Sequence, residues 1–331
     1  MAADFRNEAS QILKEYLFYQ ETVRARSSKT VNEYFIDLRT FFRYLKIHRG
    51  LVPSDVEFDK IKIDDVDLNL LKTVSLNDAY EYMNYLVRDR NNKVAARARK
   101  CSSLKGYFKF LSSNRKYLDK NPLEDLEMPK KPKKLPKYLT LEQSMELLKS
   151  VEGDYKERDY AILTLFLNCG LRVSEMAGLN YTDIRTDNTI RVVGKGNKER
   201  VIYLNKACVN ALNDYMKVRP VDGVKDKKAL FISRNHNRMS VKTIQAMVYK
   251  YLAKIGLDAQ GYSCHKLRHT AATLMYQYGD VDVRVLKEVL GHENLGTTEI
   301  YTHLSSTQLK SAACYYVNYS FFCNIAKVKS D

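Results

Sequence analysis

Apolar positions in the first 127 residues recur every three or four residues, the spacing at which side chains share one face of an α-helix. Such stripes run through residues 13–17, 34–45 and 76–87. The stretch Ser27-Ser28-Lys29-Thr30 and Ser75 stand where helix N-caps are expected before the second and third stripes. A fourth segment, 94–111, follows. We therefore predict a helical N-terminal domain over residues 1–127.

The pattern changes after residue 138. Thr140 can cap a helix, and the apolar run 161–169 reads as a buried helix ended by Gly170. Two β-rich runs, 189–193 and 199–204, flank a glycine-rich turn sequence typical of a hairpin. Further helices are predicted around 209–218 and 240–255, from residue 263, and over 283–290. The second domain, residues 139–304, should be α-rich with a small antiparallel sheet.

Residues 128–138 separate the two domains. Met128 to Lys137 holds three of the chain's six prolines and five lysines, which favours an extended linker. Five positive charges suit a strap that crosses a phosphate backbone. A different segment ends the chain, because residues 305–331 carry many apolar side chains that need a surface to cover.

The overall charge points to a polyanionic partner. Lys and Arg total 55 against 39 Asp and Glu, a formal net charge of +16, and nucleic acid is the commonest partner for so basic a chain. No apolar run reaches the length of a membrane span, and no signal peptide is recognisable. The six cysteines are scattered without a CxxC pair, which argues against a zinc ribbon and favours a reduced, cytoplasmic protein.

Residues 263–270 contain the densest group of chemically useful side chains. On a helix, His265, Arg268 and His269 would share one face, and a helix N-terminus with such a face can cradle a phosphate. Apolar residues that follow would anchor the helix and leave its first turn exposed. A zinc site on the two histidines would need a third ligand and usually a Glu beside the first His, where Lys266 stands. We therefore expect no metal.

Several short motifs occur together in this chain: G-L-R-V-S-E from Gly170, G-K-G-N-K-E-R from Gly194, H-K-L-R-H-T from His265, L-G-H from Leu290, and a tyrosine nine residues after that last histidine. In this order they resemble the tyrosine recombinase (integrase) family, most closely its Xer type. The resemblance implies a helical core-binding domain and a catalytic domain that form a clamp around DNA. It also implies site-specific strand cleavage and rejoining through a 3′-phosphotyrosine, without ATP, metal or cofactor.

The resemblance assigns roles residue by residue. It implies that Arg172 and Arg268 clamp the scissile phosphate, that Lys195 protonates the leaving 5′-oxygen, and that Tyr301 is the nucleophile. His265 would assist proton transfer, His292 would contact the phosphate, and Glu175 would orient its neighbours. Lys198 is the rival for Lys195, and Tyr315, Tyr316 and Tyr319 are rivals for Tyr301 that lack its spacing. We expect His269 to be structural or to support the catalytic residues.

Charge and position at helix starts suggest further DNA contacts, at Lys29, Arg97, Arg99, Lys105, Lys198, Arg234, Arg238 and Lys242. The family resemblance implies that the tail docks on a neighbouring protomer in a tetramer on two DNA sites, formed by this chain alone or with a related recombinase. Folding back on its own domain is the alternative for the tail.

Other functions fit parts of the same pattern. A DNA-binding relative with an idle catalytic centre is one, although the full catalytic set argues against it. A monomeric type IB topoisomerase or a telomere resolvase shares the chemistry, but the separate first domain and apolar tail favour an assembling recombinase. Residues 46–76 are longer than in compact Xer proteins, so chromosome dimer resolution and integration of a mobile element both stay open.

Overall fold

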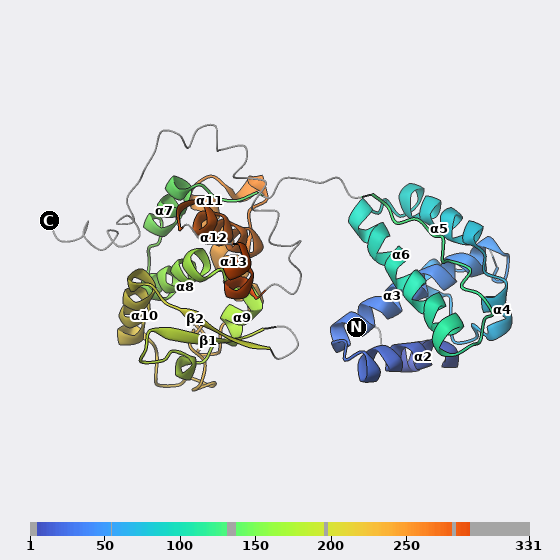
Figure 1. The fold of residues 1–331 in the computed structure, drawn as a ribbon, viewed down its shortest axis with the longest axis horizontal. Coiled ribbons are helices and arrows are strands. Elements are labelled where there is room, and N and C mark those ends of the chain that lie inside the picture. The colour runs from blue at the N-terminus through green and yellow to red at the C-terminus, as the bar shows by residue number, and fades with distance from the viewer. Residues whose placement is uncertain (1–4, 54, 131–136, 195–197, 280–282, 292–331) are drawn as a thin grey trace. The chain divides into compact units, whose positions relative to one another are not determined.

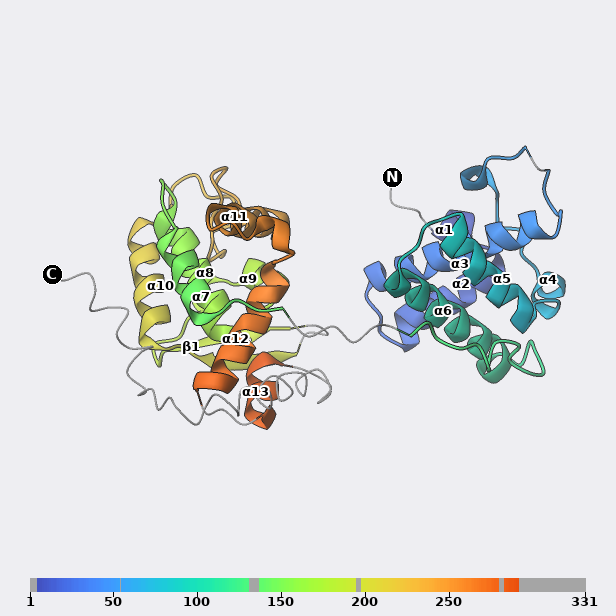
Figure 2. The same cartoon turned by 90° about the horizontal axis from the view of Figure 1, so that it is seen from above.

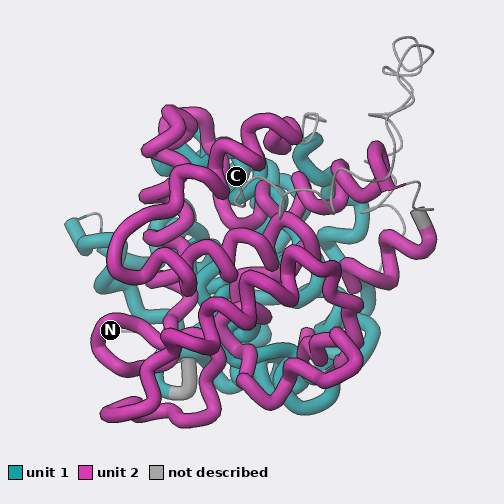
Figure 3. Tube along the Cα trace, turned by 90° about the vertical axis from the view of Figure 1, so that its left-hand side faces the viewer, with its two compact units in different colours: residues 1–133 teal, residues 134–331 magenta. Residues whose placement is uncertain are grey.

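The chain divides into two compact units, residues 1–133 and residues 134–331 (Figure 3). The computed structural model describes residues 5–53, 55–130, 137–194, 198–279 and 283–291. The division falls within the lysine- and proline-rich segment. The described residues are mainly helical, with a two-stranded antiparallel sheet in the second unit, which confirms the predicted fold class (Figure 1).

The described part of the first unit is built from helices and short helical turns. In chain order these are α1 (Phe5–Glu8), α2 (Gln11–Phe18), η1 (Tyr19–Val23), α3 (Ser28–His48), η2 (Phe58–Lys60), α4 (Leu68–Lys72), α5 (Leu76–Arg88), α6 (Val94–Lys109) and η3 (Phe110–Asn114).

Two predicted N-caps of the first unit are confirmed. The Ser27 hydroxyl accepts a hydrogen bond from the Thr30 backbone N–H at the start of α3. Ser75 and Asp78 form a reciprocal capping box at the start of α5, in which the Asp78 carboxylate accepts from the Ser75 backbone at 2.7 Å. A cap of this kind stabilises a helix by about 1 kcal/mol, so these residues fix where the two helices begin.

Helix α3 runs through the core of this unit and packs against α2, α5 and α6. Phe35, Phe41 and Phe42 of its apolar stripe are fully buried. Tyr82 of α5 and Tyr107 of α6 meet these phenylalanines edge to face. The long segment after α3 is tied back to it, since the Arg43 guanidinium donates to the Ile61 carbonyl at 2.9 Å.

The second unit has helices around one hairpin. Its described elements are α7 (Leu141–Lys149), α8 (Lys156–Cys169), α9 (Val173–Gly178), η4 (Tyr181–Asp183), β1 (Thr189–Val193), β2 (Glu199–Tyr203), α10 (Lys206–Val218), α11 (Val241–Lys254), η6 (Asp258–Gln260), α12 (Cys264–Tyr278) and α13 (Val283–Leu290).

Helix α8 is the centre of the second unit. Its residues 161–166 are almost completely buried, as expected for a helix that is apolar on every side. It lies between α10 and α12 (Figures 1 and 2). Gly170 ends it in the left-handed conformation, with φ of 58°, as the sequence predicted. The chain then turns directly into α9.

The hairpin and the last described helix complete the surroundings of this turn. Strands β1 and β2 pair in the predicted places, with Val192 opposite Arg200 and Val193 opposite Glu199. Helix α13 packs against α12 and β2.

Among the described residues, no helix has the length and apolar character needed to cross a membrane.

Candidate active site

Glu175 is the centre of a hydrogen-bonded cluster at the start of α9. Its side chain is 2 % exposed. The Arg172 backbone N–H donates to Oε2 at 2.8 Å, and the Arg172 guanidinium donates to Oε1 at 2.7 Å. Arg172 is the N-cap residue of the short helix α9. The helix therefore places the Glu175 carboxylate where it accepts hydrogen bonds from both the backbone and the side chain of Arg172.

Arg200 reaches the same carboxylate from strand β2. Its Nη1 and Nη2 donate to the two oxygens of Glu175 at 2.8 and 2.9 Å, the bidentate geometry that makes such pairs strong. Its Nε donates to the Val289 carbonyl at 3.0 Å. We assigned Arg200 no role from the sequence. Its position at the end of the G-K-G-N-K-E-R motif was the signal that could have identified it.

Arg268 approaches the cluster from α12, and its environment differs from the prediction. We expected its face of the helix start to be exposed, but its side chain is 4 % exposed. Its guanidinium donates to the Gly170 carbonyl at 2.6 Å and to the Leu290 carbonyl, and lies 4.0 Å from Glu175. Helix α13, which packs on α12, accounts for this burial.

The three arginines also bind backbone carbonyls at the end of α13. Arg200, Arg268 and Arg172 donate to the consecutive carbonyls of Val289, Leu290 and Gly291, the last at 2.9 Å. The last carbonyls of a helix lack partners within the helix, and positive charge is favourable there. The arginine cluster thus fixes the chain at residue 291, directly before His292 in the sequence.

Electrostatics keep Glu175 ionised. Burial alone would raise the pKa of this carboxyl, but hydrogen bonds from Arg200 and from the Arg172 backbone outweigh burial, and its pKa is lowered. The three arginine side chains differ in access: Arg172 is 34 % exposed, against 14 % for Arg200 and 4 % for Arg268. Arg172 therefore presents the most accessible guanidinium of the cluster to a ligand.

His265 and His269 lie one turn apart on α12, as predicted. Their rings meet edge to face, with the two Nε2 atoms 3.1 Å apart. Desolvation lowers the pKa of His265, and the positive charges of Lys266, Arg268 and Arg172 lower it further. His265 is therefore neutral at pH 7 and can accept a proton. Within the described residues, no group of three or more potential metal ligands is found.

Two motif glycines allow the close packing around the cluster. Gly170 and Gly291 have φ of 58° and 62°, a conformation that side chains disfavour. A Cβ on Gly170 would lie 2.7 Å from Leu290 Cδ2, and one on Gly291 would lie 3.3 Å from the Arg200 side chain. Substituting either glycine would push α13 or Arg200 away from the site.

Three predicted catalytic residues, Lys195, His292 and Tyr301, lie outside the described residues. The structure does bring together the others, Arg172, Glu175, His265 and Arg268, which come from distant parts of the sequence. Gly194, directly before Lys195, also lies at this cluster, since a Cβ there would be 3.5 Å from Glu175 Oε1.

The predicted DNA contacts of the first unit occupy different environments. Lys29 is exposed at the start of α3. Arg97 is half-buried. Arg99 pairs with Glu33 and Asp37, each at 2.8 Å, and Lys105 donates to the Glu124 and Leu126 carbonyls. Arg99 and Lys105 therefore already serve the packing of their own unit.

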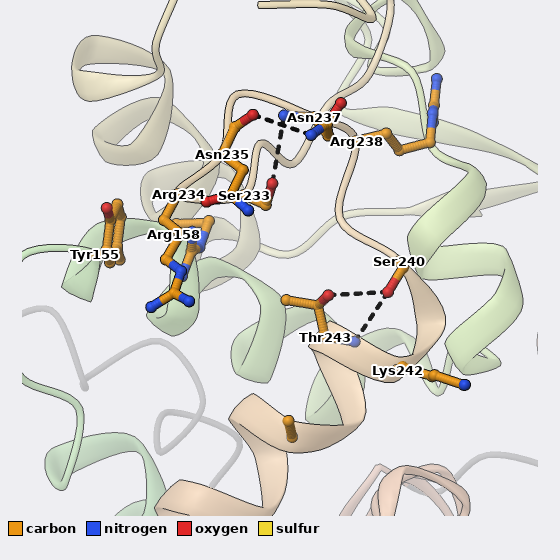
Figure 4. Close-up of a pocket in the computed structure, with 11 residues that line it drawn as sticks. Tyr155, Arg158, Ser233, Arg234, Asn235, Asn237, Arg238, Ser240, Lys242 and Thr243 are labelled. Carbon is orange, nitrogen blue, oxygen red and sulfur yellow. Dashed lines mark hydrogen bonds between the residues drawn. The ribbon is translucent and has the colours of Figure 1, made fainter.

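In the second unit, Lys198, Arg234 and Lys242 are exposed. Arg234 and Lys242 line one surface pocket, between the capped start of α11 and the Ser233–Asn237 turn (Figure 4). Arg238 also borders this pocket, but its guanidinium is bound to Asp226, Asn180 and the Leu179 carbonyl. Arg238 holds the loop together in this structure.

Comparison with known proteins identifies the class. Residues 137–308 match the phage integrase family model. The chain is 54 % identical to the tyrosine recombinase XerC of Caldanaerobacter subterraneus subsp. tengcongensis over 91 % of this chain and 85 % of that protein. It is 34 % identical to the XerC of Syntrophus aciditrophicus, over 90 % and 94 %. The chain therefore belongs to the phage integrase family and is a Xer-like tyrosine recombinase.

Solved structures show the same fold. A complex of the XerH site-specific recombinase with palindromic difH substrate matches 94 % of this chain and 95 % of its own, with a TM-score of 0.68 and 22 % identity. The Tn1549 transposon integrase with circular intermediate DNA matches 97 % of this chain and 100 % of its own, with a TM-score of 0.64 and 18 % identity. The resemblance inferred from the motifs is confirmed.

Proposed function

We propose that this enzyme cuts and rejoins DNA at specific sites through a covalent 3′-phosphotyrosine on Tyr301. The observation that carries the proposal is the Arg172 guanidinium, held by Glu175 yet one-third exposed, in one cluster with Arg268 and near His265. Planar guanidiniums can bind two phosphate oxygens at once and stabilise the charge that develops on them. The full set of catalytic residue types favours an active enzyme over an idle DNA-binding relative.

The proposed reaction is a transesterification. The Tyr301 hydroxyl oxygen attacks the phosphorus, a new tyrosine–phosphate bond forms, and the bond to the 5′-oxygen breaks. The leaving 5′-oxygen takes a proton from Lys195, or from its rival Lys198, because an alkoxide is a poor leaving group. The new ester keeps the energy of the broken bond, so rejoining needs no ATP.

The neutral histidine completes the proton balance. Tyrosine has a pKa near 10, so its hydroxyl needs a base or strong electrostatic help at neutral pH. His265 is available to accept this proton, because its lowered pKa leaves the ring neutral. His292 would contact the phosphate from the chain directly after Gly291, and His269 would orient the His265 ring through the close contact of their nitrogens. Glu175 orients Arg172 and takes no proton.

DNA binding would involve both units. We propose that residues 1–127 form a core-binding domain and residues 139–304 a catalytic domain, joined by the basic linker 128–138. The exposed cations Lys29, Lys198, Arg234 and Lys242 are suited to phosphate contacts. Arg97, Arg99, Lys105 and Arg238 would bind DNA only in addition to, or in exchange for, their present environments. The free, buried cysteines among the described residues favour a reducing compartment, the cytoplasm. Recovery of the protein in a membrane fraction would contradict this location.

We further propose assembly into a tetramer on two DNA sites, with residues 305–331 docking on the neighbouring protomer. The apolar composition of this tail supports the idea. Removing residues 312–331 should abolish pairing of two sites in a native gel while leaving single-site binding intact. Unchanged pairing would contradict docking between protomers and favour a tail that covers its own domain.

A nicked suicide duplex tests the function. The duplex carries a candidate site from the DNA flanking the gene, and adducts are separated on a denaturing gel. Wild-type protein should form a covalent adduct with or without EDTA, whereas Tyr301→Phe should bind the duplex and form none. An adduct from Tyr301→Phe would place the nucleophile elsewhere. Wild-type protein that forms no adduct with any member of a randomised site library would overturn the recombinase proposal.

A further inference from the structure

Arg200 joins three parts of the site that come from separate regions of the sequence. It holds both oxygens of Glu175, whose carboxylate holds Arg172. It holds the Val289 carbonyl near the end of α13. It also lies beside the first residue of the hairpin turn, because a Cβ on Gly194 would be 3.6 Å from Arg200 Nη1.

The position of Arg200 is tightly determined by its neighbours. Its side chain is 14 % exposed, and the backbone of Gly291 approaches it so closely that a Cβ there would lie 3.3 Å from Cδ and Nη1. All three kinds of guanidinium nitrogen carry a hydrogen bond to Glu175 or Val289. A lysine could supply the charge, but it has no planar fork to reproduce these contacts.

We propose that Arg200 is a positioning residue of the strand-transfer reaction: it fixes Glu175, and through it the Arg172 guanidinium, against Gly194 and the end of α13. This inference rests on the proposed function, since it assumes that Arg172 binds the scissile phosphate. Arg200 itself is directed at protein groups. Its loss should therefore slow cleavage of bound DNA more than it weakens DNA binding.

Another arginine of the same hairpin provides a matched control. Arg191 on β1 donates to the buried Asp183 carboxylate through Nε and Nη2, at 3.0 and 2.8 Å. It also pairs with Glu199 rather than with any residue of the cluster. Arg191→Ala thus removes a comparable arginine–carboxylate pair from the sheet without touching Glu175.

The experiment measures two quantities for wild type, Arg200→Ala and Arg191→Ala. One is the single-turnover rate of adduct formation on the suicide duplex at saturating protein, and the other is the Kd for the duplex. Arg200→Ala should slow adduct formation about 10- to 100-fold, because displacing a catalytic group by ~1 Å can cost about 100-fold. Its Kd should change less than about threefold, and Arg191→Ala should stay within about threefold of wild type in both quantities.

Rescue and a double variant separate positioning from general stability. Millimolar guanidinium should partly restore the rate of Arg200→Ala, since it can refill the space against Glu175, and should not affect Arg191→Ala. Arg200→Ala combined with Glu175→Gln should be no slower than the slower single variant, because both act through one contact. If Arg200→Ala does not fold, Arg200→Lys replaces it and should also be slowed.

Two sets of results would overturn the inference. One is a folded Arg200→Ala or Arg200→Lys that cleaves as fast as Arg191→Ala. The other is a loss of rate that multiplies with that of Glu175→Gln. Failure of the proposed function gives a different result, namely no adduct from the wild-type protein itself.

Discussion

Both units bury a carboxylate against cationic side chains, and the two arrangements differ in what they connect. In the first unit, Asp37 of α3 accepts from Lys100 and Ser103 and pairs with Arg99, all within one turn of α6. In the second unit, Glu175 meets Arg172, Arg200 and Arg268 from three separate elements. The first arrangement fastens two helices together, and the second gathers distant segments at one point.

The kind of partner distinguishes the two clusters further, whereas exposure does not, since the Arg99 side chain is 42 % exposed and that of Arg172 34 %. Lys100 is buried, and its partners are side chains of the same helix pair. Around Glu175, the arginines also hold backbone carbonyls at the ends of α8 and α13, and the Arg172 guanidinium is open to solvent. A buried carboxylate among cations is therefore weak evidence for a functional site by itself. Convergence of several chain segments on one cluster, with backbone carbonyls bound at the ends of two helices, is stronger evidence.

The largest expected effect comes from removing Arg172, the most accessible guanidinium of the Glu175 cluster. Arg172→Ala should slow adduct formation at saturating protein by about 100- to 1,000-fold, the usual loss for a donor to transition-state charge. Arg99→Ala, the matched change at the other carboxylate, should leave that rate near wild type and alter at most the Kd for DNA. A rate unaffected by Arg172→Ala, or equally reduced by both changes, would remove the distinction between the clusters.

The next effect concerns stability. Asp37→Asn leaves Lys100 buried without its charged partner, and breaking a buried pair in this way costs about 3–5 kcal/mol. Denaturant unfolding should show this loss in the free energy of unfolding. At temperatures where the variant is still folded, its rate of adduct formation should be normal. A stable Asp37→Asn with slow cleavage would mean that the first cluster also serves the reaction.

The smallest effect is the pH dependence expected from His265. Desolvation and then the charges of Lys266, Arg268 and Arg172 lower its pKa below 6.5, and His269 is its close neighbour. If His265 accepts the tyrosine proton, the apparent second-order rate of cleavage should be flat around neutral pH and fall only at more acidic pH than for an ordinary histidine, as the ring becomes protonated. His265→Gln should be slower and lack this acid limb. An unchanged limb in His265→Gln would assign it to another group.

Much of the second unit could be predicted from sequence because its signals are local. Gly170 ends α8, the glycine-rich turn marks the hairpin, and Thr140 caps α7 as expected. The family resemblance implied that Arg172 and Arg268 lie close together. It rests on the order of the motifs along the chain, and that order reflects contacts between distant segments.

Other features depend on packing between distant segments. The burial of Arg268 arises because α13 covers it, and the role of Arg200 arises from the position of β2 against α9 and α13. Likewise, the charge of Arg99, Lys105 and Arg238 gives no hint of the protein groups that they bind. For Lys195, His292 and Tyr301 the roles stay predictions, since these residues lie outside the described part of the chain.

The most direct test of the account is to identify the residue that carries the DNA. Adduct trapped on the suicide duplex is digested with protease and nuclease, and the peptide that retains a nucleotide is sequenced by mass spectrometry. We predict a 3′-linked nucleotide on Tyr301, in the peptide that follows the L-G-H motif. A nucleotide on Tyr315, Tyr316 or Tyr319, or on a residue other than tyrosine, would contradict the proposed site.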